Sequence, residues 1–407
     1  MAENVVLRRG ALTDAAFMDD PGVLASRLHE DGRAPAWARV PLIGRVLMPV
    51  RHEHVRAVLK DDATFQVARG GRPVGLAWWM PPSLRLLADN MLGRDGAEHR
   101  RLRRLVDGAF RPGALVGLEG AIENAAESAW SAAASDADGH IDLAAGFARA
   151  LPLAVICDML GLPPDDRAAF ARQAERFGRM EGPLDLLRML PTIRAMTATL
   201  RARIAAARAG RARAGLIADL VAASGDGDAL SDDELVATVF LLLMAGHETT
   251  THLVSGSILL LLREGRWDAG ALAALGARDP LVEELLRHVS PVQTVKPRRA
   301  VRDASVGDMR IARGTVVMPL LFAANRDPAC YAEPDRFDPA RFTRGEPAPV
   351  AFGAGPHFCL GHLLARMELA AALRVVARHA PGLTLAGRPR YTGRIGMRGI
   401  ASLPVAP

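Results

Sequence analysis

Apolar residues recur at intervals of three and four positions along most of this chain, which is the spacing of amphipathic helices. The strongest example follows Ser231: Ser231 and Glu234 have the spacing of a capping box, and the helix is predicted to continue to about Arg263. Residues 141–208 predict several more amphipathic helices, interrupted where Gly and Pro cluster at 161–164. The pattern therefore predicts many helices, of which the one after Ser231 is long.

Strand-like segments are few. Residues 36–50 alternate around Gly44 and predict a short hairpin, and a helix is expected over 52–60. Half of the 407 residues are hydrophobic and only 5% are aromatic, which favours a mainly helical protein with a large core. No Ser/Gly/Pro-rich linker or block of charge divides the sequence, so a single domain over 1–407 is predicted.

Charge and composition exclude several classes of function. The formal charge of +6 comes from arginines spread along many helices, and no nucleic-acid-binding module is recognisable. No apolar run approaches the ~20 residues that span a bilayer, and the chain begins without an apolar targeting segment. Three scattered cysteines agree with a reducing compartment. We therefore expect a soluble, cytoplasmic protein that binds neither nucleic acid nor membrane.

Residues 352–361 contain the most specific candidate chemistry, a single cysteine, Cys359, where a loop turns into a helix. The first turn of that helix favours a thiolate. A dinucleotide fingerprint fails because a phenylalanine stands at the third glycine position, and structural zinc fails because Cys157 and Cys330 lie far away. Two interpretations remain: a nucleophilic cysteine with His357 as its base, or a thiolate that is the single axial ligand of a haem iron.

A second candidate lies in the middle of the predicted long helix. Gly246 is followed closely by three threonines, which are poor helix formers, the glycine alone costing about 1 kcal/mol. A threonine hydroxyl there can bond back to a carbonyl, and a buried Glu248 needs a partner. Helix–helix packing through small residues would also explain the stretch. One stripe, small at its centre, would let a flat cofactor approach: Leu242, Ala245, Gly246, Thr249 and Leu253.

The order Phe352, Gly355, Cys359 and Gly361 resembles the haem-binding loop of the cytochrome P450 family. Other elements over most of the chain resemble, in the family's order, its His-x-x-x-Arg helix, its Gly-x-Glu-Thr helix, its Glu-x-x-Arg pair and its Pro-x-Arg-Phe turn. These elements are His99 and Arg103; Ala245, Gly246, Glu248 and Thr249; Glu284 and Arg287; and Arg336.

The resemblance implies a mainly α (α+β) cytochrome P450 fold with small β-sheets near the N- and C-termini. It implies haem b with Cys359 as axial thiolate, Glu248 relaying protons, and Thr249 holding the water or hydroperoxide that is protonated. The expected cofactor contacts are His99, Arg103, Ala245, Gly246, Arg298, Phe352, Gly355, His357, Cys359 and Gly361. The expected substrate contacts are Trp78, Trp79, Leu242, Ala245, Val292, Thr294, Val295 and Met397. Glu284, Arg287 and Arg336 would form a buried structural network.

The activity that the resemblance implies is a monooxygenase of secondary metabolism that uses O2 to hydroxylate or epoxidise a small, largely apolar molecule. Electrons would come from NAD(P)H through a separate ferredoxin reductase and ferredoxin, which is expected to dock on Arg100, Arg101 and Arg104. Two alternatives stay open: a haem-thiolate protein that performs phenol coupling, desaturation or peroxide-driven chemistry, and a cysteine hydrolase or ligand carrier.

Overall fold

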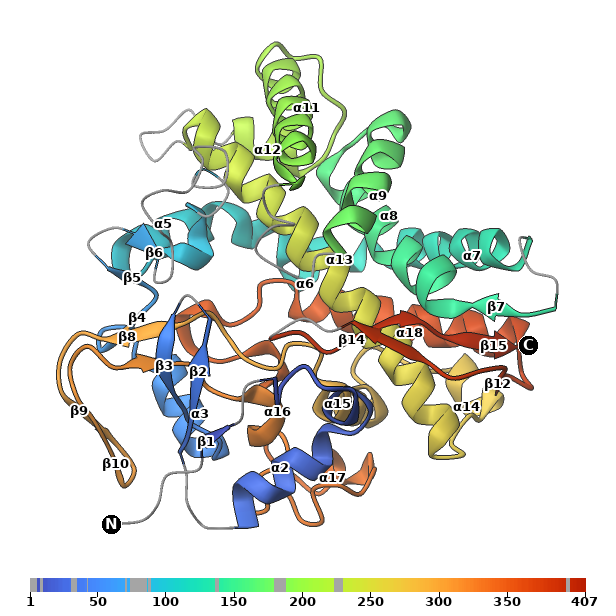
Figure 1. The fold of residues 1–407 in the computed structure, drawn as a ribbon. Coiled ribbons are helices and arrows are strands. Elements are labelled where there is room, and N and C mark those ends of the chain that lie inside the picture. Colours follow the sequence, from blue (N-terminus) through green and yellow to red (C-terminus); the bar gives the residue numbers. More distant parts are fainter. Residues whose placement is uncertain are drawn as a thin grey trace.

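Helices make up most of this computed structural model, and the strands of its largest sheet gather on one side (Figure 1). The mainly α (α+β) architecture predicted from the sequence is thereby confirmed. The structure describes residues 6–7, 10–30, 35–41, 43–69, 72–73, 86, 89–135, 139–178, 188–222, 230–392 and 396–407.

The long helix α13 (Asp232–Arg263) crosses the middle of the molecule (Figure 1). Its N-terminus has the predicted capping box: Ser231 Oγ accepts from the backbone N–H of Glu234, and the Glu234 carboxylate accepts from the N–H of Ser231. Two orphan donors of the first turn are satisfied in this way. Most of its length is buried, as expected for a helix enclosed by others.

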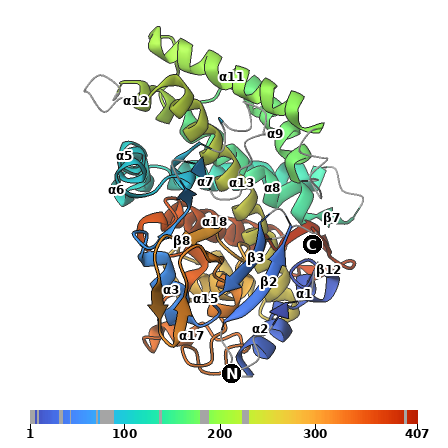
Figure 2. The same ribbon diagram turned by 60° about the vertical axis from the view of Figure 1, so that its left-hand side comes forward.

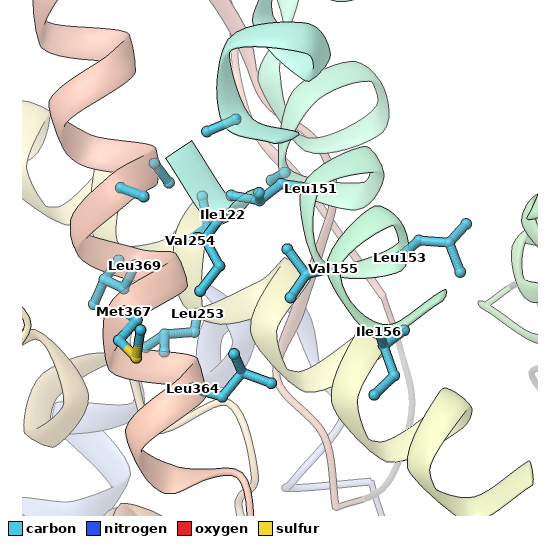
Figure 3. Close-up of a cluster of buried hydrophobic side chains, with 14 of the residues drawn as sticks. Ile122, Leu151, Leu153, Val155, Ile156, Leu253, Val254, Leu364, Met367 and Leu369 are labelled. Carbon is cyan, nitrogen blue, oxygen red and sulfur yellow. The ribbon is translucent and has the colours of Figure 1, made fainter. Parts of the chain in front are cut away.

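Three helices pack with α13 into the main core: α7 (Glu119–Ser135), α8 (Arg149–Leu160) and α18 (His362–His379). Figure 3 shows apolar side chains from all four meeting, among them Leu151 and Val254. Both are 0% exposed. Each fully buried side chain of this size contributes about 1.5–3 kcal/mol. This core holds α13 beside α18, the helix that follows the predicted cysteine loop.

An outer layer of helices lies beyond this core. It consists of α9 (Pro164–Gly178), α11 (Leu190–Arg208) and α12 (Leu216–Ala222), with α11 along the outer edge of the molecule at the top of Figure 2. Among the described residues one helical window, Leu143–Leu160, is apolar enough to cross a membrane, but 56% of it is buried inside the fold.

The largest sheet has six short strands in the order β1-β2-β3-β11-β8-β4. The predicted hairpin is confirmed as β2 (Ala36–Val40) and β3 (Gly44–Met48), paired antiparallel. Next to them β11 (Val316–Val317) runs parallel to β3 and antiparallel to β8 (Arg298–Ala300). The sheet therefore fixes the position of Arg298, which is paired with Val317.

Small sheets near the C-terminus complete the fold, as the resemblance implies. One contains β12 (Thr384–Leu385), β15 (Pro404–Ala406) and β7 (Ile141–Asp142), and the other pairs β13 (Arg390–Thr392) with β14 (Gly399–Ser402). The remaining elements are β1 (Val6–Leu7), α1 (Ala15–Asp19), α2 (Pro21–Glu30), α3 (His52–Lys60), β4 (Phe65–Gln66), β5 (Ala68–Arg69), β6 (Arg72–Pro73), η1 (Met91–Gly93), α5 (Gly96–Asp107), η2 (Gly108–Phe110), α6 (Pro112–Val116), η3 (Leu143–Ala148), α14 (Ala269–Ala273), α15 (Pro280–Val289), β9 (Ala304–Val306), β10 (Met309–Ile311), α16 (Leu321–Ala324), α17 (Ala340–Thr343), η5 (Val350–Phe352) and η6 (Gly355–His357).

A buried ion cluster joins α15 to α17. Arg287 donates to both carboxylate oxygens of Glu284, at 2.8 and 2.9 Å, and Arg341 Nε donates to Glu284 Oε1 at 3.1 Å. All three side chains are at most 1% exposed. Burial alone would raise the pKa of Glu284, but hydrogen bonds from Arg287 and the neighbouring His288 outweigh it and hold the pKa well below its usual range. We call these residues the Glu284 cluster.

The prediction that Arg336 is the third buried member of this network is wrong. Its side chain is 65% exposed and pairs with Glu333 at 3.0 Å. Only its carbonyl oxygen takes part, accepting from Arg287 at 3.3 Å and from Arg341 at 3.0 Å. Arg341, five residues later, supplies the buried guanidinium instead, because α17 turns its side chain back toward Glu284.

Candidate functional site

The loop that carries Cys359 is closed by its own backbone. The N–H of Cys359 donates to the carbonyl of Phe352 at 3.0 Å, and the N–H of Phe358 donates to Gly355 at 3.0 Å. The N–H of Gly361 points to the Cys359 sulfur. Cys359 therefore lies at the end of the loop, just before α18 begins at His362, as the sequence predicts.

Gly355 is required in this loop by its approach to α3. Its φ is +71°, and a Cβ there would lie 2.5 Å from the Leu59 carbonyl oxygen and 2.7 Å from Lys60 Cα. Only glycine fits such a position. Gly361 differs, since a Cβ on it would meet nothing nearer than a Phe110 ring carbon at 3.9 Å. The close approach at Gly355 is thus made to the protein itself and anchors the loop.

Burial raises the pKa of the Cys359 thiol, although the Gly361 N–H and the positive charges of Arg103 and Arg366 oppose this. The predicted preference for a free thiolate at the helix start is therefore outweighed. Among the described contacts His357 makes none with the sulfur; its ring lies against His99 and Asp95. A protonated thiol without a base is a poor nucleophile, whereas a bound metal ion deprotonates a coordinating thiol.

The weak stretch of α13 has the predicted back bond: Thr249 Oγ1 donates to the carbonyl of Ala245 at 2.6 Å. Ala245 is exposed although α13 crosses the middle of the molecule, and Glu248 and Thr249 are half-buried. Gly246 lies on another side, where a Cβ would be 3.8 Å from Ile156 of α8. Ala245 and Thr249 thus keep accessible surface in the middle of the molecule, and Gly246 belongs to the packing of α13 on α8.

Arg103 and His99, two of the predicted propionate ligands, contact the cysteine loop. Arg103 donates to the carbonyls of Pro356 and Phe358 at 3.0 and 2.6 Å, and the ring centroids of His99 and His357 are 4.1 Å apart. Burial, with the nearby charges of His357 and Arg103, lowers the pKa of His99 to about 4, so its ring is neutral near pH 7. Its Nδ1 has no hydrogen-bond partner among the described residues.

Arg298 is the second predicted propionate ligand, and the structure favours it over its neighbour Arg299. It is 2% exposed and burial lowers its pKa, whereas Arg299 is half-buried; the Nε of each has no partner within the described part of the chain. Arg299 instead donates to the Gly314 carbonyl at 2.6 Å on the exposed side.

Part of the predicted substrate wall comes together. Val292 and Met397 form a β-bridge, and Val292 and Val295 pack against one apolar cluster together with Ala354 of the cysteine loop. Thr294 is buried, and its hydroxyl donates to the Pro319 carbonyl at 2.8 Å, so its hydrogen-bond donor is already used by the backbone. Leu242 is 8% exposed. Trp78 and Trp79 lie outside the described residues.

The basic face of α5 is smaller than predicted. Arg100 and Arg104 are exposed. Arg101, however, is only partly accessible because it pairs with Glu98 at 3.3 Å and with Glu234 at the start of α13. A pairing with a residue so distant in the sequence leaves no local signal.

The described residues fit a flat dianionic cofactor with an axial thiolate. Buried donors, His99 Nδ1 and Arg298 Nε, lack partners in the described structure, and a buried polar group of this kind normally has one. Residues 351–363 keep some accessible surface throughout, even though the loop lies between α3 and α18. Such a set of cations, unpaired donors and one shielded thiol is typical of a haem site.

Comparison with known proteins points to one family. A family model described as "Cytochrome P450" matches residues 272–379. The chain is 32% identical over 405 residues to cytochrome P450 monooxygenase PikC of Streptomyces venezuelae, covering 98% of this chain and 94% of that protein. It is 35% identical over 336 residues to erythromycin C-12 hydroxylase of Saccharopolyspora erythraea, covering 81% and 80%. The solved structure of the bacillaene polyketide synthase cytochrome P450 PksS of Bacillus subtilis 168 superimposes with a TM-score of 0.85 at 27% identity, covering 98% of this chain and 99% of that one.

Proposed function

The chain belongs to the cytochrome P450 family, and from this premise we propose that it holds haem b on Cys359 and monooxygenates a small, largely apolar organic molecule. The observation that carries the proposal is the Cys359 loop, where a shielded sulfur receives the N–H of Gly361. Haem bound there would supply an iron centre for dioxygen chemistry, with the thiolate favouring O–O cleavage. His99, Arg103 and Arg298 would hold its carboxylates.

Thr249 and Glu248 supply the proton-handling groups. Because the Thr249 hydroxyl hydrogen is donated to the Ala245 carbonyl, the lone pairs of Oγ1 remain available to a water molecule. Glu248, the preceding residue on α13, is half-buried and can pass protons to that water. Water held at Thr249 Oγ1 therefore becomes the proton donor at the reacting centre.

The substrate class follows from the wall of the site. Val292 and Val295 are partly buried and pack against the same apolar cluster as Ala354 of the cysteine loop, and Met397 bridges to Val292, which supports a largely apolar guest. Two of the similar proteins are named for erythromycin hydroxylation and polyketide synthesis. These names support a product of secondary metabolism as the substrate here, hydroxylated at a C–H bond or epoxidised at a C=C bond.

A separate ferredoxin and its NAD(P)H-dependent reductase are the proposed electron source. The exposed Arg100 and Arg104 lie on α5, the helix that also carries His99 and Arg103, so an acidic donor bound there would be near the cofactor edge. Complementary charge mainly raises the rate of such encounters. The described cysteines are all free, which agrees with the proposed cytoplasmic location.

The decisive experiment compares Cys359→Ala with Cys330→Ala in the purified protein. Wild type and Cys330→Ala are expected to contain haem with the thiolate-type ferrous carbon monoxide spectrum. Cys359→Ala is expected to lose that spectrum, because Cys330 is a half-buried thiol outside the loop. An unchanged spectrum in Cys359→Ala, or a colourless wild-type protein, would contradict the proposal.

A further inference from the structure

A short β-bridge joins residues 396–398, just before β14, to the predicted substrate wall. One backbone N–H of this segment donates to the carbonyl of Pro291 at 2.7 Å, and one of its carbonyls accepts from the N–H of Gln293 at 3.0 Å. These two bonds flank Met397 and Val292, the two residues of the bridge. The pattern is that of a non-hydrogen-bonded antiparallel pair, in which the opposite side chains lie close together on one face.

Met397 and its neighbour Arg398 point to opposite faces of this segment, because successive side chains alternate in extended backbone. The Arg398 guanidinium contacts helix α1. Met397 therefore lies on the face turned away from α1, together with Val292. Val292 packs against the same apolar cluster as Ala354 of the cysteine loop.

The guanidinium of Arg398 binds the C-terminal end of α1. Its Nε donates to the carbonyl of Met18 at 2.7 Å, and its Nη2 donates to the carbonyl of Asp19 at 3.0 Å. Carbonyls in the last turn of a helix have no partner within the helix and carry a partial negative charge. Because the guanidinium is planar, two bonds to two successive carbonyls fix both its position and its direction. We call these two bonds the Arg398–α1 contact.

Helix α1 is itself held firmly by the rest of the fold. The Asp19 carboxylate accepts from Arg263, the last residue of α13, at 2.7 Å and from the Tyr391 hydroxyl of β13 at 2.8 Å. The side chains of Phe17 and Met18 are buried, at 3% and 1% exposure. The end of α1 therefore offers Arg398 a fixed support.

The bridge alone is a weak support for Met397. It consists of one residue pair outside the longer strands, and a slip of one residue would turn Met397 to the opposite face. Such a slip would also turn Arg398 away from the carbonyls of α1. The Arg398–α1 contact therefore favours the register that places Met397 beside Val292.

We propose that Arg398 is a positioning residue for substrate recognition, which holds Met397 at the wall of the site through the Arg398–α1 contact. The inference rests on the proposed function, which places Met397 in that wall. Helix α1, which has no part in the chemistry, thereby takes part in substrate specificity. Loss of the contact should weaken ligands that reach the wall and spare small ligands that bind at the iron.

The first test measures the binding of two ligands to ferric haem by the shift of its main absorbance band. Imidazole needs little more room than the iron position, whereas 4-phenylimidazole needs room beside the wall for its phenyl ring. Arg398→Gln should bind 4-phenylimidazole about tenfold more weakly and imidazole within about twofold of wild type. Arg390→Gln, at an exposed position of β13, is the matched control and should leave both affinities unchanged.

Equal weakening of both ligands in Arg398→Gln, or no weakening of 4-phenylimidazole, would overturn the proposal. Arg398→Lys keeps the charge but offers one ammonium to two carbonyls, so it should weaken 4-phenylimidazole by about threefold. This variant carries the same comparison if Arg398→Gln does not fold.

A double-substitution cycle separates positioning from a general structural role. In the Met397→Ala background, Arg398→Gln should leave the affinity for 4-phenylimidazole within about twofold, because the side chain that Arg398 positions is already absent. A role that does not act through Met397 would instead give the same tenfold loss in both backgrounds, and that result would contradict the proposal.

A third measurement observes Met397 directly in the diamagnetic ferrous carbon monoxide form. Labelling with methyl-carbon-13 methionine gives methyl signals, and the signal missing from Met397→Ala identifies Met397. This signal should shift in Arg398→Gln and stay in place in Arg390→Gln. An unmoved signal in Arg398→Gln would count against the positioning role. A wild-type protein without the thiolate-type carbon monoxide spectrum would instead contradict the proposed function.

Discussion

The Glu284 cluster and the site around Cys359 both contain buried charged residues, and they differ in how completely these are paired. In the Glu284 cluster the carboxylate accepts hydrogen bonds from Arg287, from Arg341 and from the backbone N–H of Asp338. In the site around Cys359, by contrast, His99 Nδ1 and Arg298 Nε have no partner among the described residues. Both groups are buried and rich in arginine, so composition alone does not separate them.

The difference predicts which group is completed by folding and which takes a ligand. Removing one partner from a satisfied buried pair strands a charge, so the Glu284 cluster should govern stability. Unpaired donors instead gain their partner when a ligand binds, so the Cys359 site should govern cofactor content and chemistry. Substitutions in the two groups should therefore change different measurements.

The largest expected effect is the loss of the central carboxylate. Glu284→Gln should lower the free energy of unfolding by about 3–5 kcal/mol, because the buried Arg287 loses its counter-charge and Arg341 keeps only Glu346. Arg336→Met is the control, and its exposed side chain predicts a change within about 0.5 kcal/mol. Urea unfolding measures both. Equal losses for the two variants would restore Arg336 to the network and remove the contrast between the groups.

Glu248→Gln should act on chemistry and leave folding intact. Product formed per NAD(P)H consumed is expected to fall about a hundredfold, because an amide cannot relay a proton to water at Thr249. Glu264→Gln, at the exposed C-terminal end of the same helix, is the matched control. Chromatography of product against cofactor consumption gives the ratio. A large drop in the urea midpoint of Glu248→Gln would place Glu248 with the structural group instead.

Gly355→Ala tests the anchoring of the cysteine loop. The new Cβ would press on the Leu59 carbonyl, so we expect a loss of about 2 kcal/mol in stability together with lower haem content. Gly314 has a φ of +89° and open space around it. Gly314→Ala should therefore lower the stability by about 1 kcal/mol and leave the haem content normal. Haem per protein from absorbance, with urea unfolding, checks both. Equal haem content in the two variants would argue against the anchor.

The smallest effect is a pH dependence of the Glu284 cluster. Burial lowers the pKa of His288 to about 4, from about 6.5 in the unfolded chain. Between these values the unfolded state binds a proton that the folded state does not, so stability falls as the pH falls from 6.5 to 4. His288→Gln should reduce this slope by up to one proton, measured by urea midpoints at several pH values. An unchanged slope would show that His288 titrates normally.

Features set by neighbours along the chain could be predicted from the sequence. The capping box at Ser231, the hairpin of β2 and β3, and the Thr249 back bond to Ala245 all join residues a few positions apart. Their energetics depend on local spacing, which the sequence displays directly. The Cys359 loop belongs with them, because its closing bond to Phe352 spans only seven residues.

Other features could be identified only in the tertiary structure. Arg341, rather than Arg336, faces Glu284, Gly246 faces α8, and Gly355 is crowded by α3. Each depends on a contact between distant segments, and such contacts leave no periodic pattern in the chain. By itself the sequence determined the helices, the cysteine loop and the kinds of side chain available for chemistry. Only the tertiary structure decided which buried polar groups are paired and which, like Arg298 Nε, have no partner among the described residues, because pairing depends on distances that folding alone sets.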